Sequence, residues 1–96
     1  MRPSEALPLH RDTIRRLVAE AGMANPRVFG SVLSGEDTED SDLDILVDPA
    51  PRTTLLDLAG LQIEIEAQTA LKVDLLTPGF LPSKFRQTVI DEAKPV

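Results

Sequence analysis

The sequence predicts a small α/β domain of the α+β type, in which a mixed β-sheet of three or four strands packs with helices. Three observations lead to this prediction. The chain has 96 residues, a length that suits a single hydrophobic core. It contains three short aliphatic runs of strand length. Segments whose apolar residues recur at helical spacing alternate with these runs, as expected for a layered α/β structure.

In the first third of the chain, the pattern predicts an arm, two helices and one strand. Residues 1–8 carry two prolines and little pattern, so we expect a flexible N-terminal arm, with the folded domain spanning residues 9–96. Helical periodicity predicts a first helix over residues 9–21. Residues 26–29 are expected to form a short strand that a glycine ends, and residues 31–34 a brief helix.

The remainder of the chain predicts two more strands and two more helices. Aliphatic residues over 43–47 and 73–76 predict strands. A capping box precedes a helix that extends from residue 54 to about residue 71. Within it, residues 61–66 also alternate with period two, so a strand remains an alternative there, although the cap favours a helix. A last helix is expected over residues 83–93.

The helical spacing also predicts which side chains these two helices bury. The third helix is expected to face the core with Leu55, Leu58, Ala59 and Leu61. The last helix is expected to turn Phe85, Val89 and Ile90 inward.

Composition excludes several classes of function. The chain has no cysteine and one histidine, His10, so a disulfide, a thiolate metal site and a hydrolytic triad are disfavoured. A net charge of −6 and only three aromatic residues argue against autonomous binding to nucleic acid. No aliphatic run approaches the roughly 20 residues of a membrane span, so we expect a cytoplasmic protein without membrane contact.

The charge is concentrated in one segment. Seven carboxylates lie between Glu36 and Asp48, and no basic residue separates them. Such crowding is unfavourable unless solvent or a cation relieves it. For residues 36–40 we expect a solvated acidic loop, because polar runs between structured elements usually are solvated loops.

Asp42 and Asp44 form the first chemical motif. On a strand, residues spaced by two point to the same face, so their carboxylates lie close enough to share a divalent cation. Oxygen ligands suit Mg²⁺ or Mn²⁺, and Mg²⁺ typically takes one or two protein carboxylates together with substrate phosphates. A nucleoside triphosphate is therefore the expected substrate, although acidic pairs at strand entrances are often merely solvated.

Gly30 and Ser31 form the second motif. Glycine at a strand-to-helix turn lets the backbone approach a ligand, while the following N–H groups and the Ser31 hydroxyl can donate to phosphate oxygens. An ordinary turn with Ser31 as helix cap is the structural alternative. Together with the aspartate pair, the turn brackets one triphosphate, with donors at one end and a metal at the other.

Gly30-Ser31, ten intervening residues and then Asp42-Leu43-Asp44, flanked by Phe29 and Ser41, resemble the signature of the DNA polymerase β-like nucleotidyltransferase superfamily. The resemblance is strongest to its minimal nucleotidyltransferase (MNT) group, the MntA-type antitoxins that pair with HEPN-domain toxins. It extends over nearly the whole chain, and it implies a polymerase β-like nucleotidyltransferase core.

This resemblance also implies roles for individual residues. Asp42, Asp44 and Asp74 would bind two Mg²⁺ ions, or Mn²⁺, and Asp74 would help to deprotonate the attacking hydroxyl. Gly30, Ser31 and Ser41 would contact the nucleotide, with ATP as substrate. One departure is Ser34, which stands where many relatives carry a basic residue. Arg27 lies too far back to replace it, and Lys72 is a speculative substitute.

The function that the resemblance implies is that of an antitoxin in a type VII-like HEPN/MNT pair. As a protein adenylyltransferase, it would move AMP from ATP to a tyrosine of its cognate HEPN ribonuclease toxin. Two alternatives remain open. The chain could neutralise the toxin by binding alone, covering a basic RNA site with residues 36–48, or it could serve as a nucleotidyltransferase subunit that modifies a small-molecule hydroxyl. Nucleotide preference, the number of groups transferred and complex stoichiometry stay open as well.

Overall fold

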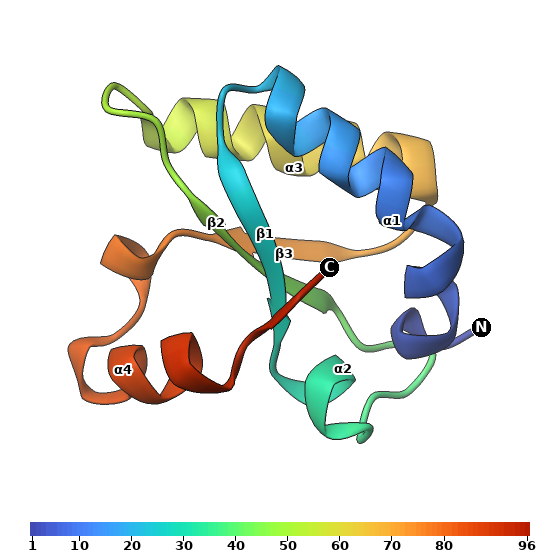
Figure 1. Ribbon diagram of the computed structural model, residues 1–96. Coiled ribbons are helices and arrows are strands. Elements are labelled where there is room, and N and C mark those ends of the chain that lie inside the picture. The colour runs from blue at the N-terminus through green and yellow to red at the C-terminus, as the bar shows by residue number, and fades with distance from the viewer.

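The computed structural model, which describes residues 1–96, confirms the α/β architecture with a four-stranded mixed sheet (Figure 1). Its elements in order are α1 (Pro3–Glu20), β1 (Ala24–Phe29), α2 (Ser31–Ser34), β2 (Leu43–Asp48), α3 (Leu55–Thr69), β3 (Val73–Leu76), the 3₁₀ helix η1 (Pro78–Phe80), α4 (Ser83–Glu92) and β4 (Lys94–Pro95). The sheet has the order β3-β2-β1-β4. Only the β2–β3 pair is parallel.

One face of the sheet carries the hydrophobic core. Helices α1 and α3 lie together over this face (Figure 1), and their apolar side chains pack on alternate residues of the strands, including Val28, Ile45 and Leu75. The intervening strand residues point to the opposite face, because side chains alternate along a strand. That second face carries Phe29, Asp44 and Asp74, so two of the three predicted catalytic carboxylates lie on it.

Helix α1 begins earlier than the sequence suggested. It starts at Pro3, so the expected boundary between a flexible arm and the domain at residue 8 falls inside a helix. Proline is well tolerated in the first turn, where its missing N–H has no helical partner. Ala6 and Leu7 are buried, and this packing extends the helix through Pro8.

The acidic loop of residues 36–40 is solvated only in part, and the expectation is wrong for Asp37, which is 3% exposed. The backbone N–H of Ser4 in the first turn of α1 donates to Oδ2 of Asp37 over 2.8 Å. Burial opposes ionisation of Asp37, but the hydrogen bonds from Ser4 and the positive charge of Arg2 together outweigh it and hold its pKa below the ordinary value. Asp37 therefore caps α1 from a distance of 33 residues along the chain.

Replacing Asp37 with alanine is expected to lower the free energy of unfolding by about 1 to 2 kcal/mol, the cost of losing a helix cap. Because folding lowers the pKa of Asp37, its stabilisation is fully present above the unfolded pKa of about 4 and is lost as the pH falls through the lower folded pKa. Urea unfolding at pH 7 and pH 3 measures both effects. Asp40→Ala serves as the control, since Asp40 is exposed. Equal stability of the two variants at pH 7 would contradict the capping role.

Helix α3 confirms the helical interpretation of residues 61–66, and its capping box forms between Thr54 and Asp57 as expected. Its buried face is rotated from the prediction. Leu58 and Leu61 are buried together with Ile65, whereas Leu55 is 64% exposed and Ala59 is also exposed. Helix α3 packs against β3 and α1, and this packing decides which of its side chains are buried. The apolar spacing at the start of the helix therefore predicted the buried face poorly.

Helix α3 also protects the outer edge of the sheet. Strand β3 lies at this edge, where unpaired N–H groups would invite pairing with another chain. The N–H of Val73 donates to Oε2 of Glu66 over 2.9 Å, and the N–H of Leu75 donates to Oε1 of Gln62 over 3.2 Å. Gln62 and Glu66, from the segment with period-two alternation, thus accept hydrogen bonds from the backbone N–H groups of the edge strand β3, although the segment itself is helical.

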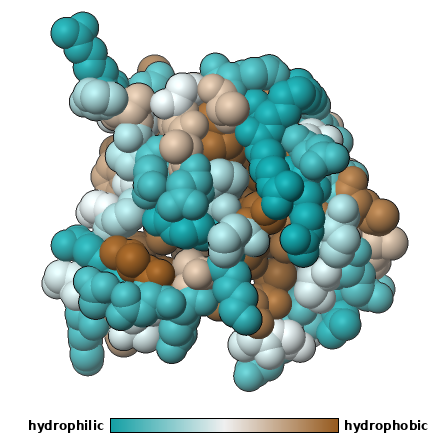
Figure 2. All heavy atoms as spheres, viewed as in Figure 1, coloured by the Kyte–Doolittle hydropathy of each residue, from teal (hydrophilic) through white to brown (hydrophobic).

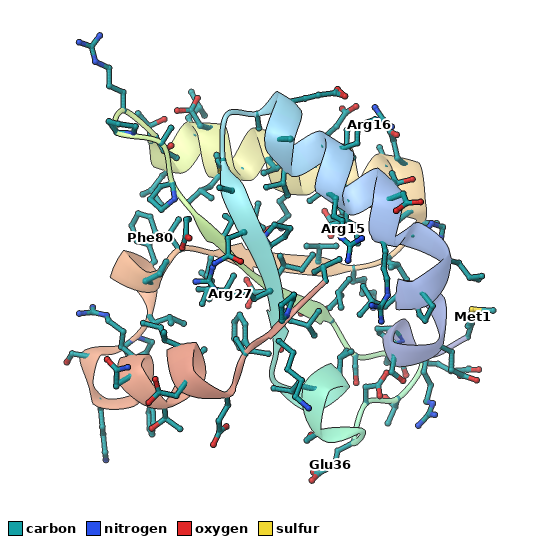
Figure 3. The ribbon with its side chains drawn as sticks, in the orientation of Figure 1. Met1, Arg15, Arg16, Arg27, Glu36 and Phe80 are labelled. Atoms are coloured by element: carbon teal, nitrogen blue, oxygen red, sulfur yellow. The ribbon has the colours of Figure 1, made fainter.

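Helix α4 is held loosely against the rest of the protein. Val89 and Ile90 are half-buried, but Phe85, which was expected to face inward, is 55% exposed, and no side chain of α4 is fully buried. The chain then forms the short strand β4 against β1. Val96, the last residue, is buried. Arg15 of α1, labelled in Figure 3, donates from Nε to the carbonyl oxygen of Val96 over 2.9 Å. No helix is long and apolar enough to cross a membrane.

Candidate active site

Two of the three predicted catalytic carboxylates stand side by side on the open face of the sheet. Phe29 of β1 pairs with Asp44 of β2, and Asp44 pairs with Asp74 of β3. Directly paired residues on neighbouring strands share a face. The pairing therefore aligns Phe29, Asp44 and Asp74 in one row across the sheet, although Asp74 follows Asp44 by thirty residues.

Asp42 lies just before β2, two residues from Asp44. It is exposed, as is Asp74, whereas Asp44 between them is half-buried. Burial of Asp44, together with the negative charges of Asp74 and then Asp42, raises its pKa to about 6. The charges of Asp74 and Asp42 thus disfavour ionisation of Asp44, and a cation bound beside these carboxylates would relieve the repulsion.

Gly30 brings the second motif against this row. Its backbone has φ of 74° and ψ of −150°, a region that side-chain-bearing residues avoid. A Cβ atom at this position would overlap Oδ2 of Asp44 and lie 3.2 Å from its Cγ. The strand-to-helix turn therefore needs glycine for two reasons, its conformation and the closeness of the Asp44 carboxylate.

The two serines predicted to contact the nucleotide, Ser31 and Ser41, differ in whether their side chains are already hydrogen-bonded within the protein. Ser31 is the first residue of α2 and is half-buried. Ser41 is half-buried too, but its Oγ already accepts the N–H of Thr38 over 2.8 Å. Ser41 thus has a local structural role in the acidic loop, and its contact with a nucleotide stays a prediction, as does that of Ser31.

The donor set fits Mg²⁺ better than a metal that requires a complete protein cage. No group of three acidic or histidine side chains is arranged as a preformed metal cluster. Mg²⁺ does not need one, because it commonly binds one or two carboxylates and completes its octahedron with water and phosphate oxygens. Asp42 and Asp44 could supply such a partial set, and their assignment as metal ligands, like that of Asp74, stays a prediction.

The basic residue absent at position 34 has no replacement in Arg27. The guanidinium of Arg27 is buried and donates from Nη1 to Oδ1 of Asp48 over 3.1 Å and to the carbonyl of Asn25 over 2.8 Å. Figure 3 shows it within the sheet region rather than at the turn. Ser34 instead donates to the carbonyl of Ser31 over 3.2 Å. Arg27 is therefore a structural residue.

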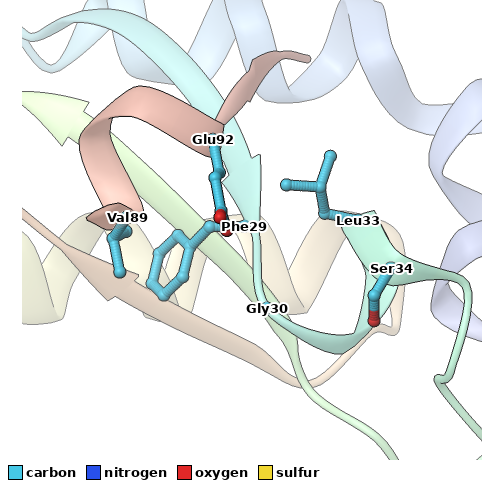
Figure 4. A pocket seen from close by; sticks show the side chains of 6 residues that line it. All are labelled: Phe29, Gly30, Leu33, Ser34, Val89 and Glu92. Carbon is cyan, nitrogen blue, oxygen red and sulfur yellow. The ribbon is translucent and has the colours of Figure 1, made fainter. Parts of the chain in front are cut away.

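Beside the turn lies a pocket that sequence reasoning did not find. Phe29, Gly30, Leu33 and Ser34 form one side, and Val89 and Glu92 of α4 form the other (Figure 4). Val89 and Glu92 are three residues apart on α4, so they lie on the same face of the helix. This spacing could indicate a pocket only once the position of α4 against β1 was known. The site thus combines clustered carboxylates, a glycine corner and an adjoining apolar cavity, an arrangement suited to phosphoryl transfer.

Comparisons with known proteins agree with this chemistry. A family model described as a nucleotidyltransferase domain matches residues 10–96. The chain is 38% identical over 86 residues to the protein adenylyltransferase MntA of Thermococcus cleftensis, covering 90% of this chain and 84% of the relative.

Solved structures show the same fold. A minimal nucleotidyltransferase superposes with a TM-score of 0.84 and 40% identity, covering 97% of this chain and 95% of the other. A complex of tri-AMPylated Shewanella oneidensis HEPN toxin with its MNT antitoxin gives a TM-score of 0.69 and 21% identity, covering 92% of this chain and 69% of that one. At that identity the second similarity concerns the fold alone.

Proposed function

Because the chain belongs to the nucleotidyltransferase domain family, we propose that it is the antitoxin of a HEPN/MNT pair and transfers AMP from ATP to a tyrosine of its cognate HEPN toxin. The observation that carries this proposal is the row of Asp44 and Asp74 beside the Gly30 corner. The 38% identity of the chain to a protein adenylyltransferase supports a protein as the acceptor of AMP.

The lining of the pockets also favours a protein acceptor. Neither of the two pockets is lined by Asp42, Asp44 or Asp74. A folded partner brings its own contact surface, whereas a small-molecule acceptor would need a pocket formed by these carboxylates. The donor is ATP with Mg²⁺, and Mg²⁺, when bound, would neutralise the phosphates and polarise the α-phosphorus.

The residues of the chain then have separate tasks in the transfer. Asp42 and Asp44 would hold Mg²⁺ bound to the nucleotide, and the backbone at Gly30 and Ser31 orients the phosphate tail. The acceptor hydroxyl oxygen attacks the α-phosphorus while the bond between that phosphorus and the bridging oxygen breaks, so that diphosphate leaves. Asp74 accepts the hydroxyl proton. Positioning and electrostatic stabilisation account for most of the acceleration in such reactions.

Intact-mass measurement of the toxin after co-expression tests this proposal. With the unmodified chain, the toxin is expected to gain the mass of one or more adenylyl groups. With an Asp42→Asn, Asp44→Asn double variant, the complex should still form and the mass gain should disappear. Asp40→Asn is the matched control, because it removes an exposed negative charge of the same loop.

Two results would count against transfer. An unmodified toxin in a complex with the unmodified chain would exclude adenylylation of this partner. Full protection of cells by the double variant would instead favour neutralisation by occlusion, in which the exposed acidic residues 36, 39 and 40 cover a basic surface.

A further inference from the structure

The pocket beside the glycine corner has a volume of about 420 Å³, within the range of about 300 to 1,000 Å³ typical of small-molecule sites. It lies between the β1–α2 corner and α4. Figure 4 shows the ring of Phe29 beside Val89, the side chain of Leu33 across the opening, and the Glu92 side chain extending from α4 toward Phe29. The catalytic steps described above use none of the three apolar side chains.

Away from the Gly30 backbone, the side chains that line the pocket are unsuited to phosphate. Its walls are the apolar side chains of Phe29, Leu33 and Val89, and no lysine or arginine lines it. The single charged side chain is the Glu92 carboxylate, which repels phosphate. Figure 2 shows apolar atoms exposed among the hydrophilic surface of this side of the molecule. A flat, neutral group with a hydrogen-bond donor on its edge matches these walls.

The row across the sheet distinguishes the donor from the acceptor. In the order β3-β2-β1, Asp74 and Phe29 lie on opposite sides of Asp44. The acceptor hydroxyl approaches Asp74, which takes its proton, and therefore reaches the site over β3. The pocket opens beside β1, on the side of Asp44 away from the acceptor. The group that occupies it must accordingly belong to the nucleotide donor.

We infer, on the basis of the proposed function, that this pocket binds the nucleobase of the donor nucleotide, with Phe29 and Val89 against the base and Glu92 accepting a hydrogen bond from its exocyclic amine. Base–aromatic stacking is a substantial source of affinity. A bound base would also give α4 packing that it lacks, since α4 has no fully buried side chain.

Filling the pocket separates binding of the base from binding of the phosphates. Val89→Trp places a large ring where the base is expected, and calorimetry would compare a non-hydrolysable ATP analogue with inorganic tripolyphosphate, both with Mg²⁺. The variant should weaken binding of the analogue about 10-fold or more and leave binding of tripolyphosphate unchanged. Thr88→Trp is the control, because Thr88 is exposed on α4 and does not line the pocket.

Three results would overturn this assignment. They are unchanged binding of the ATP analogue by Val89→Trp, an equal loss for the analogue and tripolyphosphate, and normal ATP binding with a raised KM for the toxin. The third would assign the pocket to the acceptor. Each is distinguishable from failure of the proposed function, in which the unmodified chain adds no mass to the toxin.

Glu92 offers a second test that does not depend on fitting a large ring. It is exposed on α4, so Glu92→Ala should fold normally. The unmodified chain is expected to bind ATP about 10-fold more tightly than purine riboside triphosphate, which lacks the amine. Glu92→Ala should remove that preference. A preference that persists in the variant would show that Glu92 does not read the base.

Discussion

Replacing Asp44 with asparagine is expected to abolish AMP transfer and to stabilise the metal-free protein. A carboxylate ligand to the nucleotide-bound metal contributes several kcal/mol to the transition state, so transfer should fall at least about 1,000-fold. The same carboxylate carries an unfavourable charge in the absence of metal, because burial and the charges of Asp74 and Asp42 raise its pKa to about 6.

The sign of the stability change follows from that direction. A group whose pKa rises on folding contributes stability below its unfolded pKa of about 4, and this contribution is lost as the pH rises through about 6. At pH 7, ionised Asp44 therefore opposes folding. Removing the charge should increase the free energy of unfolding by about 1 to 2 kcal/mol, after allowance for solvent screening of a half-buried group.

Thermal unfolding in EDTA at pH 7 and pH 4.5 measures this effect. The Tm of Asp44→Asn should exceed that of the unmodified chain at pH 7, by about 4 to 8 °C per kcal/mol, and the difference should shrink at pH 4.5, where Asp44 is protonated. Asp40→Asn, at an exposed position, should show neither the loss of activity nor the gain. A variant that unfolds more easily at pH 7 would contradict the electrostatic description of the site.

Replacing Gly30 with alanine is expected to damage both folding and transfer. The backbone at φ 74° and ψ −150° costs about 1 to 3 kcal/mol for a residue with a side chain. The added Cβ also overlaps Oδ2 of Asp44, so the carboxylate must move away from the position proposed for metal binding. A small displacement of a reacting group costs about 100-fold in rate.

A second variant, Gly22→Ala, separates the cost of the backbone conformation from the effect of contact with Asp44. Gly22 has φ of 77°, but a Cβ atom there would meet nothing within 4 Å. Gly22→Ala should therefore lose about 1 kcal/mol of stability for its backbone conformation and keep its transfer rate. Unfolding free energies and initial rates of toxin adenylylation provide the comparison. Equal rates in the two glycine variants would argue against contact between the Gly30 corner and Asp44.

The sequence predicted the parts of the fold that local chemistry determines. The bounds of α2 and β3 match the prediction because glycines close the first and a turn with proline ends the second. It missed the start of α1, since residues 3–8 become helical through burial of Ala6 and Leu7 and a hydrogen bond from distant Asp37. Neither contact leaves a trace in local periodicity.

The candidate site also has a part that local sequence predicts and a part that depends on how distant segments pack. Spacing alone predicted a shared face for Asp42 and Asp44. Asp74 was identified only through resemblance, because nothing near residue 74 reveals that β3 pairs in parallel with β2. The pocket was not predictable, since Val89 and Glu92 join it only through the docking of α4. Helix α4 even presents Phe85 outward, contrary to its apolar spacing.

A crystal structure of the chain with Mg²⁺ and a non-hydrolysable ATP analogue would test most directly whether the carboxylates of Asp42, Asp44 and Asp74 form one catalytic site. The expected result is Mg²⁺ at about 2.0 to 2.1 Å from oxygens of Asp42 and Asp44, with the phosphate tail against Gly30 and the Asp74 carboxylate turned toward the α-phosphorus. The account would be contradicted by Asp74 facing away from the pair with no ion between the three side chains.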